Sequence, residues 1–346
     1  MLKITIILIY FQIASCFKPI FIVPGLGGSV LLDTTTNERV WPPSSDIFLK
    51  KTPFYEKMDY NANLKTLELG DIKGIDVENS FTRLIMGGSY LKSIINHYES
   101  NVYALPYDFR KIAAENVLNE WCSKVKIYIE MISKNSNNKI SIIAHSFGGI
   151  LIHYYLTKYV NQSWKDSYVD KLTLINVPFG GCNNIVEMYF KNRLNIKIPF
   201  SKAIDLNFIK MYDAILWCLP YEPFGEKVND IIYKNREIIY TKNNFIEAEE
   251  FKIFKKYFIE QIQNKLQYKS ISPGVDTTVI CSRGIPTIDK IILDPILTYE
   301  FKDGDGVITL ESMMTIPKLW KDAKIYTLDG EHTKVLHKKE LHDFLI

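Results

Sequence analysis

Apolar residues follow two different periods in the stretch from about residue 100 to 180. Lys139 to Ala144 (KISIIA) is short, apolar and rich in β-branched residues, which is typical of a buried strand. Gly149 to Val160 then predicts a helix, and Lys171 to Val177 predicts a further strand that Pro178 stops. Earlier apolar residues at helical spacing predict an amphipathic helix packed on a sheet: Val117, Trp121, Val125, Ile129 and Ile132. The order strand, helix, strand indicates a parallel sheet.

The N-terminus has an apolar run of another kind. Met1-Leu2-Lys3 precedes the run Ile4 to Ala14, and the small residues Ser15 and Cys16 follow. This pattern predicts a secretory signal peptide over residues 1–16, because the run is too short to cross a bilayer core of about 30 Å. A buried first strand and a lipoprotein box with a lipidated Cys16 are the alternatives. Pro19 to Val23 comes next and predicts the first strand of a domain spanning 17–346.

Two long segments fit the regular pattern poorly. Residues 33–74 are rich in Thr, Asn, Lys and Pro, with aromatics scattered among the lysines. Residues 182–268 are mostly helical in pattern, with five apolar residues on one face: Phe251, Phe254, Phe258, Ile262 and Leu266. Long segments between core elements are often lids or caps over an active site, so we expect a lid at 33–74 and a helical cap at 182–268. An extra packing layer is the alternative.

The composition restricts the function classes. The 346 residues are 47% apolar, which excludes a disordered chain and leaves room for one large domain or two modest ones. Lys and Arg number 42 against 39 Asp and Glu, and no basic stripe stands out, so nucleic acid is not an expected partner.

The cysteines fit an oxidising compartment. If Cys16 leaves with the signal peptide, four remain: Cys122, Cys182, Cys218 and Cys281. An even number is compatible with disulfides, but four cysteines allow three pairings. No pair has the spacing of zinc ligands, and we expect neither a metal nor a cofactor.

A candidate nucleophile lies between the predicted strand and helix. Ser146 stands in Ala144 to Gly149 (AHSFGG), which resembles G-x-S-x-G with Ala144 at the first glycine. Such a serine is held on a tight turn with its hydroxyl above the end of a sheet, and small residues are needed where the backbone turns back. The motif alone is common by chance. Its position after a strand and before a helix favours the α/β-hydrolase fold, with a mostly parallel sheet flanked by helices.

A serine needs a base to take its proton, and in this fold the partners follow in the order serine, acid, histidine. His332 is the favoured base, because it follows a strand-like run, Lys324 to Leu328, and a turn at Asp329-Gly330. His145 adjoins the nucleophile, so its side chain must point elsewhere. The other four are expected to be core or surface residues: His97, His153, His337 and His342.

The acid is expected in Asp303-Gly304-Asp305-Gly306, a sharp turn 27 residues before His332. A surface turn and a calcium loop are alternatives, but Val307 supplies no oxygen ligand where calcium would need one.

A glycine-rich loop follows the first strand at Val23 to Gly28 (VPGLGG). Gly25 and Gly27 let backbone N–H groups face a developing negative oxygen, and each such donor can contribute about 3 kcal/mol. The predicted donors are the amides of Leu26 and Phe147. A phosphate-binding loop is a weaker alternative, because neither G-x-G-x-x-G nor a following Gly-Lys-Ser/Thr is present.

At this point the chain resembles the lecithin:cholesterol acyltransferase family, which includes the lysosomal group XV phospholipase A2. The matching segments are PIFIVPGLGG (19–28), LPYDFR (105–110), AHSFGG (144–149), PFGG (178–181), PGV (273–275), GIPT (284–287), DGDGVI (303–308) and Glu331-His332. The resemblance covers nearly the whole chain after residue 16.

The resemblance implies residue roles. Ser146 would attack a phospholipid ester, His332 would act as base and Asp305, the second aspartate of the D-G-D element, would orient it. Asp108 and Arg110 would shape the site rather than react. Residues 33–74 would form the membrane-touching lid and 182–268 the cap.

The sequence departs from the family in its cysteines. The lid region has none, and Ile316 stands where the partner of Cys281 is expected, so the family's disulfides do not transfer.

The leading hypothesis is a secreted or luminal O-acyltransferase and phospholipase A that passes an acyl chain to an alcohol such as a sterol, or to water. Its expected partners are phospholipids, acyl acceptors and a membrane or lipoprotein surface. A neutral lipase or carboxylesterase is one alternative, and an inactive lipid-binding member of the fold is another. The acceptor, the head group and the oligomeric state are not indicated by the sequence.

Overall fold

The structure is a computed structural model of the 346-residue chain. It describes residues 18–43, 54–77, 90–98, 101–191, 209–210, 212–220, 231–235, 238–241, 244, 247, 267–293 and 296–345. The predicted signal peptide therefore lies outside the described residues, as do the predicted apolar helix face at 251–266 and residues 44–53 of the predicted lid.

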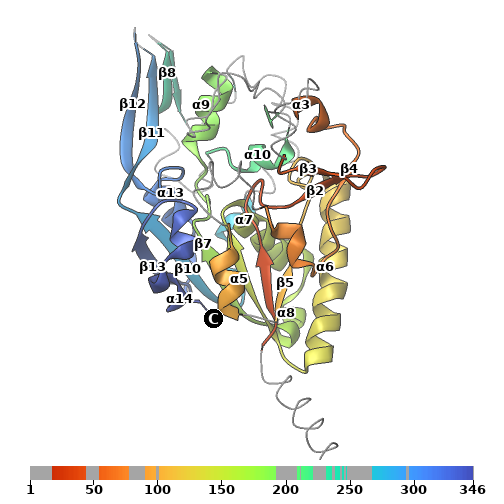
Figure 1. The fold of residues 1–346 in the computed structure, drawn as a ribbon. Helices are drawn as coiled ribbons and strands as arrows, with labels where there is room; N and C mark the ends of the chain where they lie inside the picture. Colours follow the sequence, from red (N-terminus) through yellow and green to blue (C-terminus); the bar gives the residue numbers. More distant parts are fainter. Residues whose placement is uncertain are drawn as a thin grey trace, which may run out of the picture.

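A parallel sheet of six strands forms the centre of the molecule (Figure 1). Its strands in chain order are β1 (Ile20–Val23), β5 (Val102–Ala104), β6 (Ile140–His145), β7 (Val169–Ile175), β10 (Asp276–Arg283) and β13 (Lys324–Asp329). Their order across the sheet is β13-β10-β7-β6-β1-β5, and all five pairings are parallel. Parallel strands align their carboxyl ends at one edge, so the loops after β1, β6 and β13 emerge on the same side.

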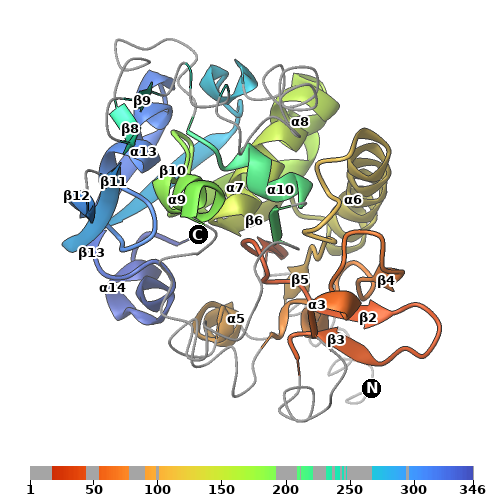
Figure 2. The ribbon, with the colours of Figure 1, turned by 90° about the horizontal axis from the view of Figure 1, so that it is seen from above.

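Apolar layers cover both faces of this sheet. In β1, Ile20 and Ile22 pack on one face, whereas Phe21 and Val23 pack on the other. One layer includes residues of α6 (Glu115–Ser136), α7 (Phe147–Tyr154) and α8 (Gln162–Tyr168). The opposite layer includes residues of α5 (Lys92–Tyr98) and α14 (Lys339–His342), and Figure 2 shows the two groups of helices on either side. Burial on both faces explains why the inner strands β1 and β6 are almost entirely apolar.

The predicted elements between 100 and 180 are confirmed. The predicted helix ending at Ile132 is α6, the predicted strands are β6 and β7, and the sheet is parallel. The helix predicted at 149–160 begins earlier, at Phe147, and its last turn, η2 (Tyr155–Tyr159), is a π-helix.

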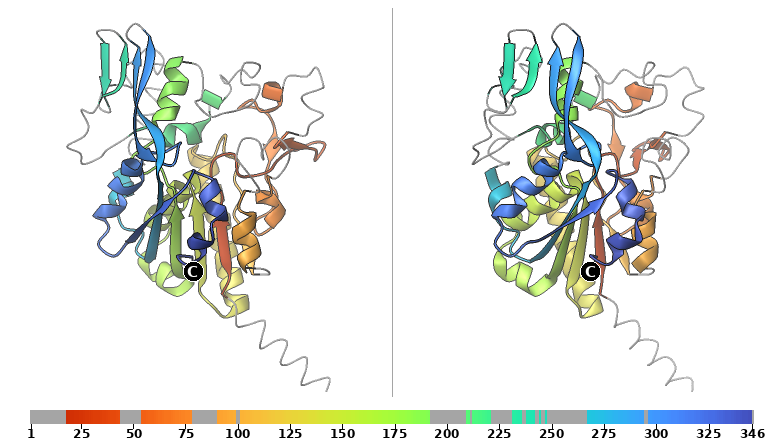
Figure 3. Two further views of the ribbon diagram at one scale, coloured as in Figure 1. Left: turned by 60° about the vertical axis from the view of Figure 1, so that its left-hand side comes forward. Right: turned by 90° about the vertical axis from the view of Figure 1, so that its left-hand side faces the viewer.

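Two smaller sheets lie beyond the central one (Figure 3). The three-stranded sheet pairs β2 (Leu31–Asp33) with β3 (Arg39–Trp41) and β4 (Leu64–Lys65). The four-stranded sheet has the order β12-β11-β8-β9 and contains β8 (Ile231–Asn235), β9 (Ile238–Thr241), β11 (Ile285–Leu293) and β12 (Leu297–Gly304). The short elements are α3 (Phe54–Lys57), η1 (Ile72–Ile75), α9 (Asn183–Lys191), α10 (Asp213–Trp217), η8 (Gln267–Ser270), α13 (Leu310–Thr315), η9 (Pro317–Leu319) and η10 (Lys334–His337).

The segment 182–268, predicted as a helical cap, also contains strands. Its described part has helices α9 and α10, but β8 and β9 form a pair that joins β11. The sequence pattern did not indicate these strands, because β8 pairs with residues 291–293, more than 50 positions later in the chain.

Among the described residues, no helix combines the length and the apolar character needed to cross a bilayer.

A buried histidine in α7 makes stability depend on pH. His153 donates from Nε2 to the Ile271 carbonyl at 2.8 Å and stacks on Trp320. Burial lowers its pKa from 6.5 to about 4, so between these values the unfolded chain binds a proton that the folded chain does not. We expect this group to remove up to about 3 kcal/mol of stability as the pH falls from about 6.5 to about 4.

The measurement is urea unfolding at about pH 6.5 and about pH 4.5, in wild type and His153→Gln. The slope should be smaller in the variant by the contribution of His153, while His145, whose pKa is also lowered by burial, keeps its own contribution. Equal slopes in the two proteins would contradict the assignment.

Candidate active site

Ser146 lies on a sharp turn between β6 and α7. Its backbone has φ 53° and ψ −129°, a strained conformation for a residue with a Cβ atom. The turn brings Gly148 so close to the end of β1 that an added Cβ would lie 2.3 Å from the Pro24 carbonyl oxygen. An added Cβ on Gly149 would lie 2.2 Å from a Val177 methyl group. The small residues of the motif are therefore required by packing, and Ala144 fits the first position, fully buried.

The structure brings His332 to Ser146. The Ser146 hydroxyl lies 3.0 Å from Nε2 of His332 and can donate its hydrogen there. The other ring nitrogen, Nδ1, lies 2.6 Å from Oδ2 of Asp305 and donates to it. The His332 backbone N–H also donates to the Asp305 carbonyl at 2.9 Å, so loop and side chain are held together. This is the geometry that a serine nucleophile, a base and an orienting acid need.

Asp305 is fixed by hydrogen bonds to both of its carboxylate oxygens. Its side chain is fully buried, and Oδ1 accepts from the backbone N–H groups of Val307 at 2.9 Å and Ile308 at 2.7 Å. Oδ2 is left to face His332. These amides hold the carboxylate in place.

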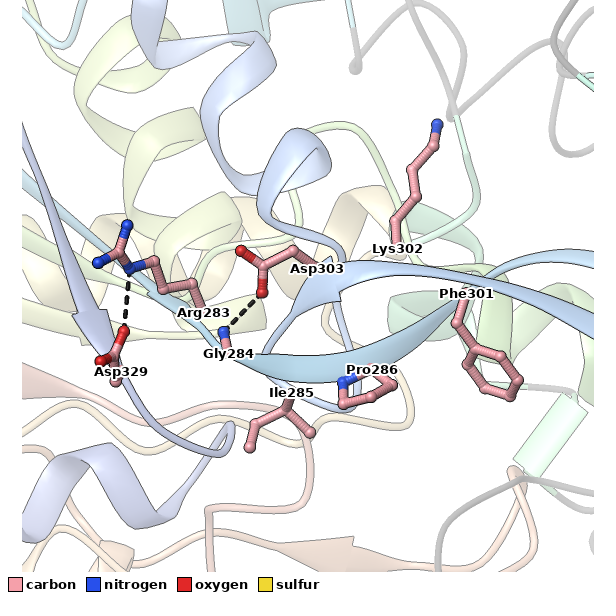
Figure 4. A pocket seen from close by; sticks show the side chains of 8 residues that line it. All are labelled: Arg283, Gly284, Ile285, Pro286, Phe301, Lys302, Asp303 and Asp329. Carbon is pink, nitrogen blue, oxygen red and sulfur yellow. Dashed lines mark hydrogen bonds and ion pairs between the residues drawn. The ribbon is translucent and has the colours of Figure 1, made fainter.

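Asp303, the other aspartate of the turn, has a different position. Its exposed side chain accepts from the Gly284 N–H at 2.5 Å (Figure 4). It helps to line a surface pocket with Arg283, Gly284, Ile285, Pro286, Phe301, Lys302 and Asp329. The position of each side chain thus distinguishes the two aspartates of the turn: Asp305 faces His332, and Asp303 does not contact it.

The glycine-rich loop lies against the serine. Gly25 approaches so closely that an added Cβ would be 3.0 Å from Ser146 Cβ, and Gly27 has φ +73°, which favours glycine. Two side chains hold the loop: Trp41 donates to the Gly27 carbonyl at 2.6 Å, and Tyr107 donates to the Pro24 carbonyl at 2.7 Å.

The two predicted amide donors lie in the elements that meet at Ser146. Leu26 is in this loop next to Gly25, and Phe147 is the first residue of α7. The N–H of a first helical residue has no partner within the helix and is free to bind an oxygen. Their role toward an oxyanion stays a prediction.

Asp108 and Arg110 anchor the loop that follows α3. The fully buried Arg110 guanidinium donates to both carboxylate oxygens of Asp108, at 3.0 and 2.7 Å. It also donates to the carbonyls of Asp59 at 2.6 Å and Ala62 at 3.2 Å. The pair therefore fixes part of the predicted lid to the core, which supports a shaping role.

Removal of Arg110 should be strongly destabilising. Arg110→Ala removes the guanidinium donors of a carboxylate and two carbonyls, so we expect the free energy of unfolding to fall by about 3–5 kcal/mol. Urea unfolding measures it. Arg283→Ala is the control, because the Arg283–Asp329 ion pair in Figure 4 has side chains that are 51% and 72% exposed and should contribute only about 0–1 kcal/mol. Similar losses in both variants would contradict this view.

The remaining histidines lie away from the nucleophile, except His145. His97 and His342 contact each other at the surface, His337 is exposed in η10, and His153 is buried as described. His145 contacts Tyr90 and the backbone of His332, and its ring centroid lies 4.8 Å from that of His332. Sequence reasoning missed Tyr90 and gave His145 no role, although its place beside the nucleophile was a signal.

The four described cysteines are buried and free. Burial raises the pKa of Cys122, Cys182 and Cys281 to about 12, so these side chains are neutral thiols rather than reactive thiolates. Burial also raises the pKa of Cys218.

The chain is similar to several known proteins. A family model described as lecithin:cholesterol acyltransferase matches residues 88–279. The lysosomal phospholipase A and acyltransferase of Rattus norvegicus is 24% identical over 227 residues, which cover 62% of this chain and 52% of that protein. The phosphatidylcholine-sterol acyltransferase of Gallus gallus is 23% identical over 254 residues, which cover 67% of this chain and 59% of that protein. The chain thus matches little more than half the length of these relatives.

Among solved structures, the crystal structure of the Tle4-Tli4 complex is similar, with a TM-score of 0.63 and 12% identity. The match covers 93% of this chain and 96% of that chain. The similarity in fold extends across the molecule, and the fold is the predicted α/β-hydrolase fold.

Proposed function

Because the chain belongs to the lecithin:cholesterol acyltransferase family, we propose that it is a serine-dependent phospholipase A and O-acyltransferase. The observation that carries the proposal is the hydrogen-bonded series Asp305, His332 and Ser146, with distances of 2.6 and 3.0 Å. The names of the relatives, a phospholipase A and acyltransferase and a phosphatidylcholine-sterol acyltransferase, support a phospholipid as acyl donor.

In the proposed first step, Ser146 Oγ attacks the ester carbonyl carbon while His332 Nε2 takes its proton. The amides of Leu26 and Phe147 bind the negative oxygen of the tetrahedral intermediate. The ester C–O bond then breaks, and His332 returns the proton to the leaving alkoxide, which departs as a lysophospholipid. Asp305 keeps Nδ1 protonated and stabilises the imidazolium.

In the second step, His332 removes a proton from the acceptor hydroxyl, which attacks the acyl-serine carbonyl. The bond between the acyl carbon and Ser146 Oγ then breaks, and His332 returns the proton to Oγ. A sterol or another alcohol yields a new ester, and water yields a free fatty acid. The ratio of transfer to an alcohol over hydrolysis by water depends on how well the closed site excludes water.

The test uses phosphatidylcholine vesicles with a labelled acyl chain, with and without a sterol. We expect labelled fatty acid with and without the sterol. Labelled sterol ester in the sample with the sterol would identify the sterol as an acyl acceptor. A triacylglycerol emulsion is the comparison. Cleavage of triacylglycerol but not of phosphatidylcholine would replace the proposal with a neutral lipase.

The proposed setting is the secretory or endolysosomal lumen or the cell exterior, with peripheral contact to a membrane or lipoprotein surface. The charged start and apolar run of residues 1–16 support a signal peptide. N-terminal sequencing of protein recovered from a secreting host tests this, and an intact Met1 would contradict it.

A further inference from the structure

A buried histidine connects the nucleophile's strand to the loop that carries the base. His145, the last residue of β6, is 2% exposed. Its Nε2 lies 3.0 Å from the backbone carbonyl oxygen of His332. A carbonyl can only accept a hydrogen bond, so the hydrogen of a neutral His145 is on Nε2 and Nδ1 is an acceptor. The tautomer is therefore fixed by its surroundings.

Tyr90 extends this connection to the glycine-rich loop. Its hydroxyl oxygen accepts from the Gly25 N–H at 2.6 Å and lies 2.9 Å from His145 Nδ1. Because Nδ1 carries no hydrogen, the Tyr90 hydroxyl must donate to it. The direction of every bond follows: Gly25 N–H to Tyr90, Tyr90 O–H to His145, and His145 N–H to the His332 carbonyl.

The series keeps one protonation state. Burial holds the pKa of His145 well below its usual value and the pKa of Tyr90 well above its own. A second hydrogen on His145 would be on Nδ1 and would point at the Tyr90 oxygen. That oxygen already accepts from the Gly25 N–H, and the hydrogen of the Tyr90 hydroxyl would lose its acceptor. Both groups are therefore neutral and act through geometry.

Both ends of the series lie at the proposed reacting groups. An added Cβ on Gly25 would be 3.0 Å from Ser146 Cβ and 3.1 Å from both His145 Nδ1 and Tyr90 Oη, so the loop, the nucleophile and the two side chains are in mutual contact. At the other end, the His332 carbonyl also accepts from Asn176 Nδ2 at 3.0 Å. Two donors thus fix the backbone of the base.

We propose that Tyr90 and His145 are positioning residues that hold the glycine-rich oxyanion loop and the His332 loop in register with Ser146. This inference rests on the proposed function, because it assigns these residues to the same acyl-transfer site. Neither side chain reacts. Each limits how far the oxyanion donors and the base can move relative to the hydroxyl, and small misplacements of such groups are costly in rate.

The experiment compares Tyr90→Phe, His145→Leu, His145→Gln and the double variant Tyr90→Phe/His145→Leu with wild type. The readouts are kcat and KM on a soluble ester, and the rate constant for labelling by a fluorophosphonate. The labelling rate constant is fitted to the fraction that reacts, so it does not depend on how much protein is folded.

We expect Tyr90→Phe and His145→Leu each to lower kcat and the labelling rate constant about 10- to 100-fold, with KM changed less than about 3-fold. The kcat and the labelling rate constant of the double variant should be no lower than those of the less active single variant, because removal of either residue already breaks the series of hydrogen bonds. His145→Gln should recover much of the loss, since its amide can donate to the His332 carbonyl and accept from Tyr90.

Tyr155→Phe is the matched control. Tyr155 is equally buried, but within the described part of the chain its hydroxyl makes no hydrogen bond. Its removal should leave the rate unchanged. If the wild type is active and both Tyr90→Phe and His145→Leu react at the wild-type rate, this inference is overturned and the proposed function is not. A wild-type chain that neither cleaves esters nor reacts with the fluorophosphonate would overturn the proposed function and this inference with it.

Discussion

Replacement of Ser146 by alanine should lower kcat for ester cleavage by roughly 10⁵- to 10⁶-fold and abolish fluorophosphonate labelling. The Oγ atom is the only group placed 3.0 Å from Nε2 of His332 in the described structure, and alanine offers nothing to attack the carbonyl carbon. The fold should survive, because alanine keeps the Cβ atom and the tightly packed Gly148 and Gly149 are unchanged. Residual ester cleavage would come from the oxyanion donors and substrate binding alone.

The matched control is Ser141→Ala in the same strand. Ser141 is fully buried, and its hydroxyl has no hydrogen-bond partner among the described residues. We expect wild-type rates and labelling, because β6 keeps its backbone pairing with β1 and β7. If Ser146→Ala were still labelled, the nucleophile would have to be sought elsewhere.

Asp305→Asn should lower kcat by about 10⁴-fold while leaving the protein folded. In the wild type, Oδ1 accepts from the amides of Val307 and Ile308, and Oδ2 accepts from His332 Nδ1. Asparagine can keep the first role with its carbonyl oxygen, so its amide nitrogen must face His332. An amide nitrogen donates, which forces the hydrogen of His332 onto Nε2, where it opposes the Ser146 hydroxyl.

Kinetics and thermal unfolding together test this explanation. The rate of fluorophosphonate labelling should fall with kcat, while the midpoint of thermal unfolding should change little, since the two backbone amides keep an acceptor. Asp303→Asn is the control. Among the described residues, its exposed side chain binds the Gly284 N–H alone, so a change in kcat below about 3-fold is expected. A larger effect at Asp303 than at Asp305 would reverse the assignment of the acid.

The inner strands of the central sheet could be predicted because they are buried on both faces. Runs such as KISIIA carry this burial in a few adjacent residues, and the flanking helices show the 3.6-residue period. The turn at Ser146 was also predictable, because packing against β1 and Val177 admits only glycine at 148 and 149, and these are visible in the sequence.

The supports of the site could not be predicted in the same way. Tyr90 meets His145 across 55 positions, and His145 meets the His332 carbonyl across 187. Such bonds leave no periodicity, and one of them ends on a backbone atom that any residue could supply. The Arg110 contacts with the carbonyls of Asp59 and Ala62 have the same character. Strand β8 was missed because it pairs with β11, more than 50 positions later in the chain.

The separation of the base from the nucleophile also bears on biosynthesis. A ribosome joins His332 to the chain 186 residues after Ser146. Until then the nascent polypeptide has a serine hydroxyl without its imidazole, and so it has no activated nucleophile. The reactive centre can therefore form only after both segments have been synthesised and have folded together.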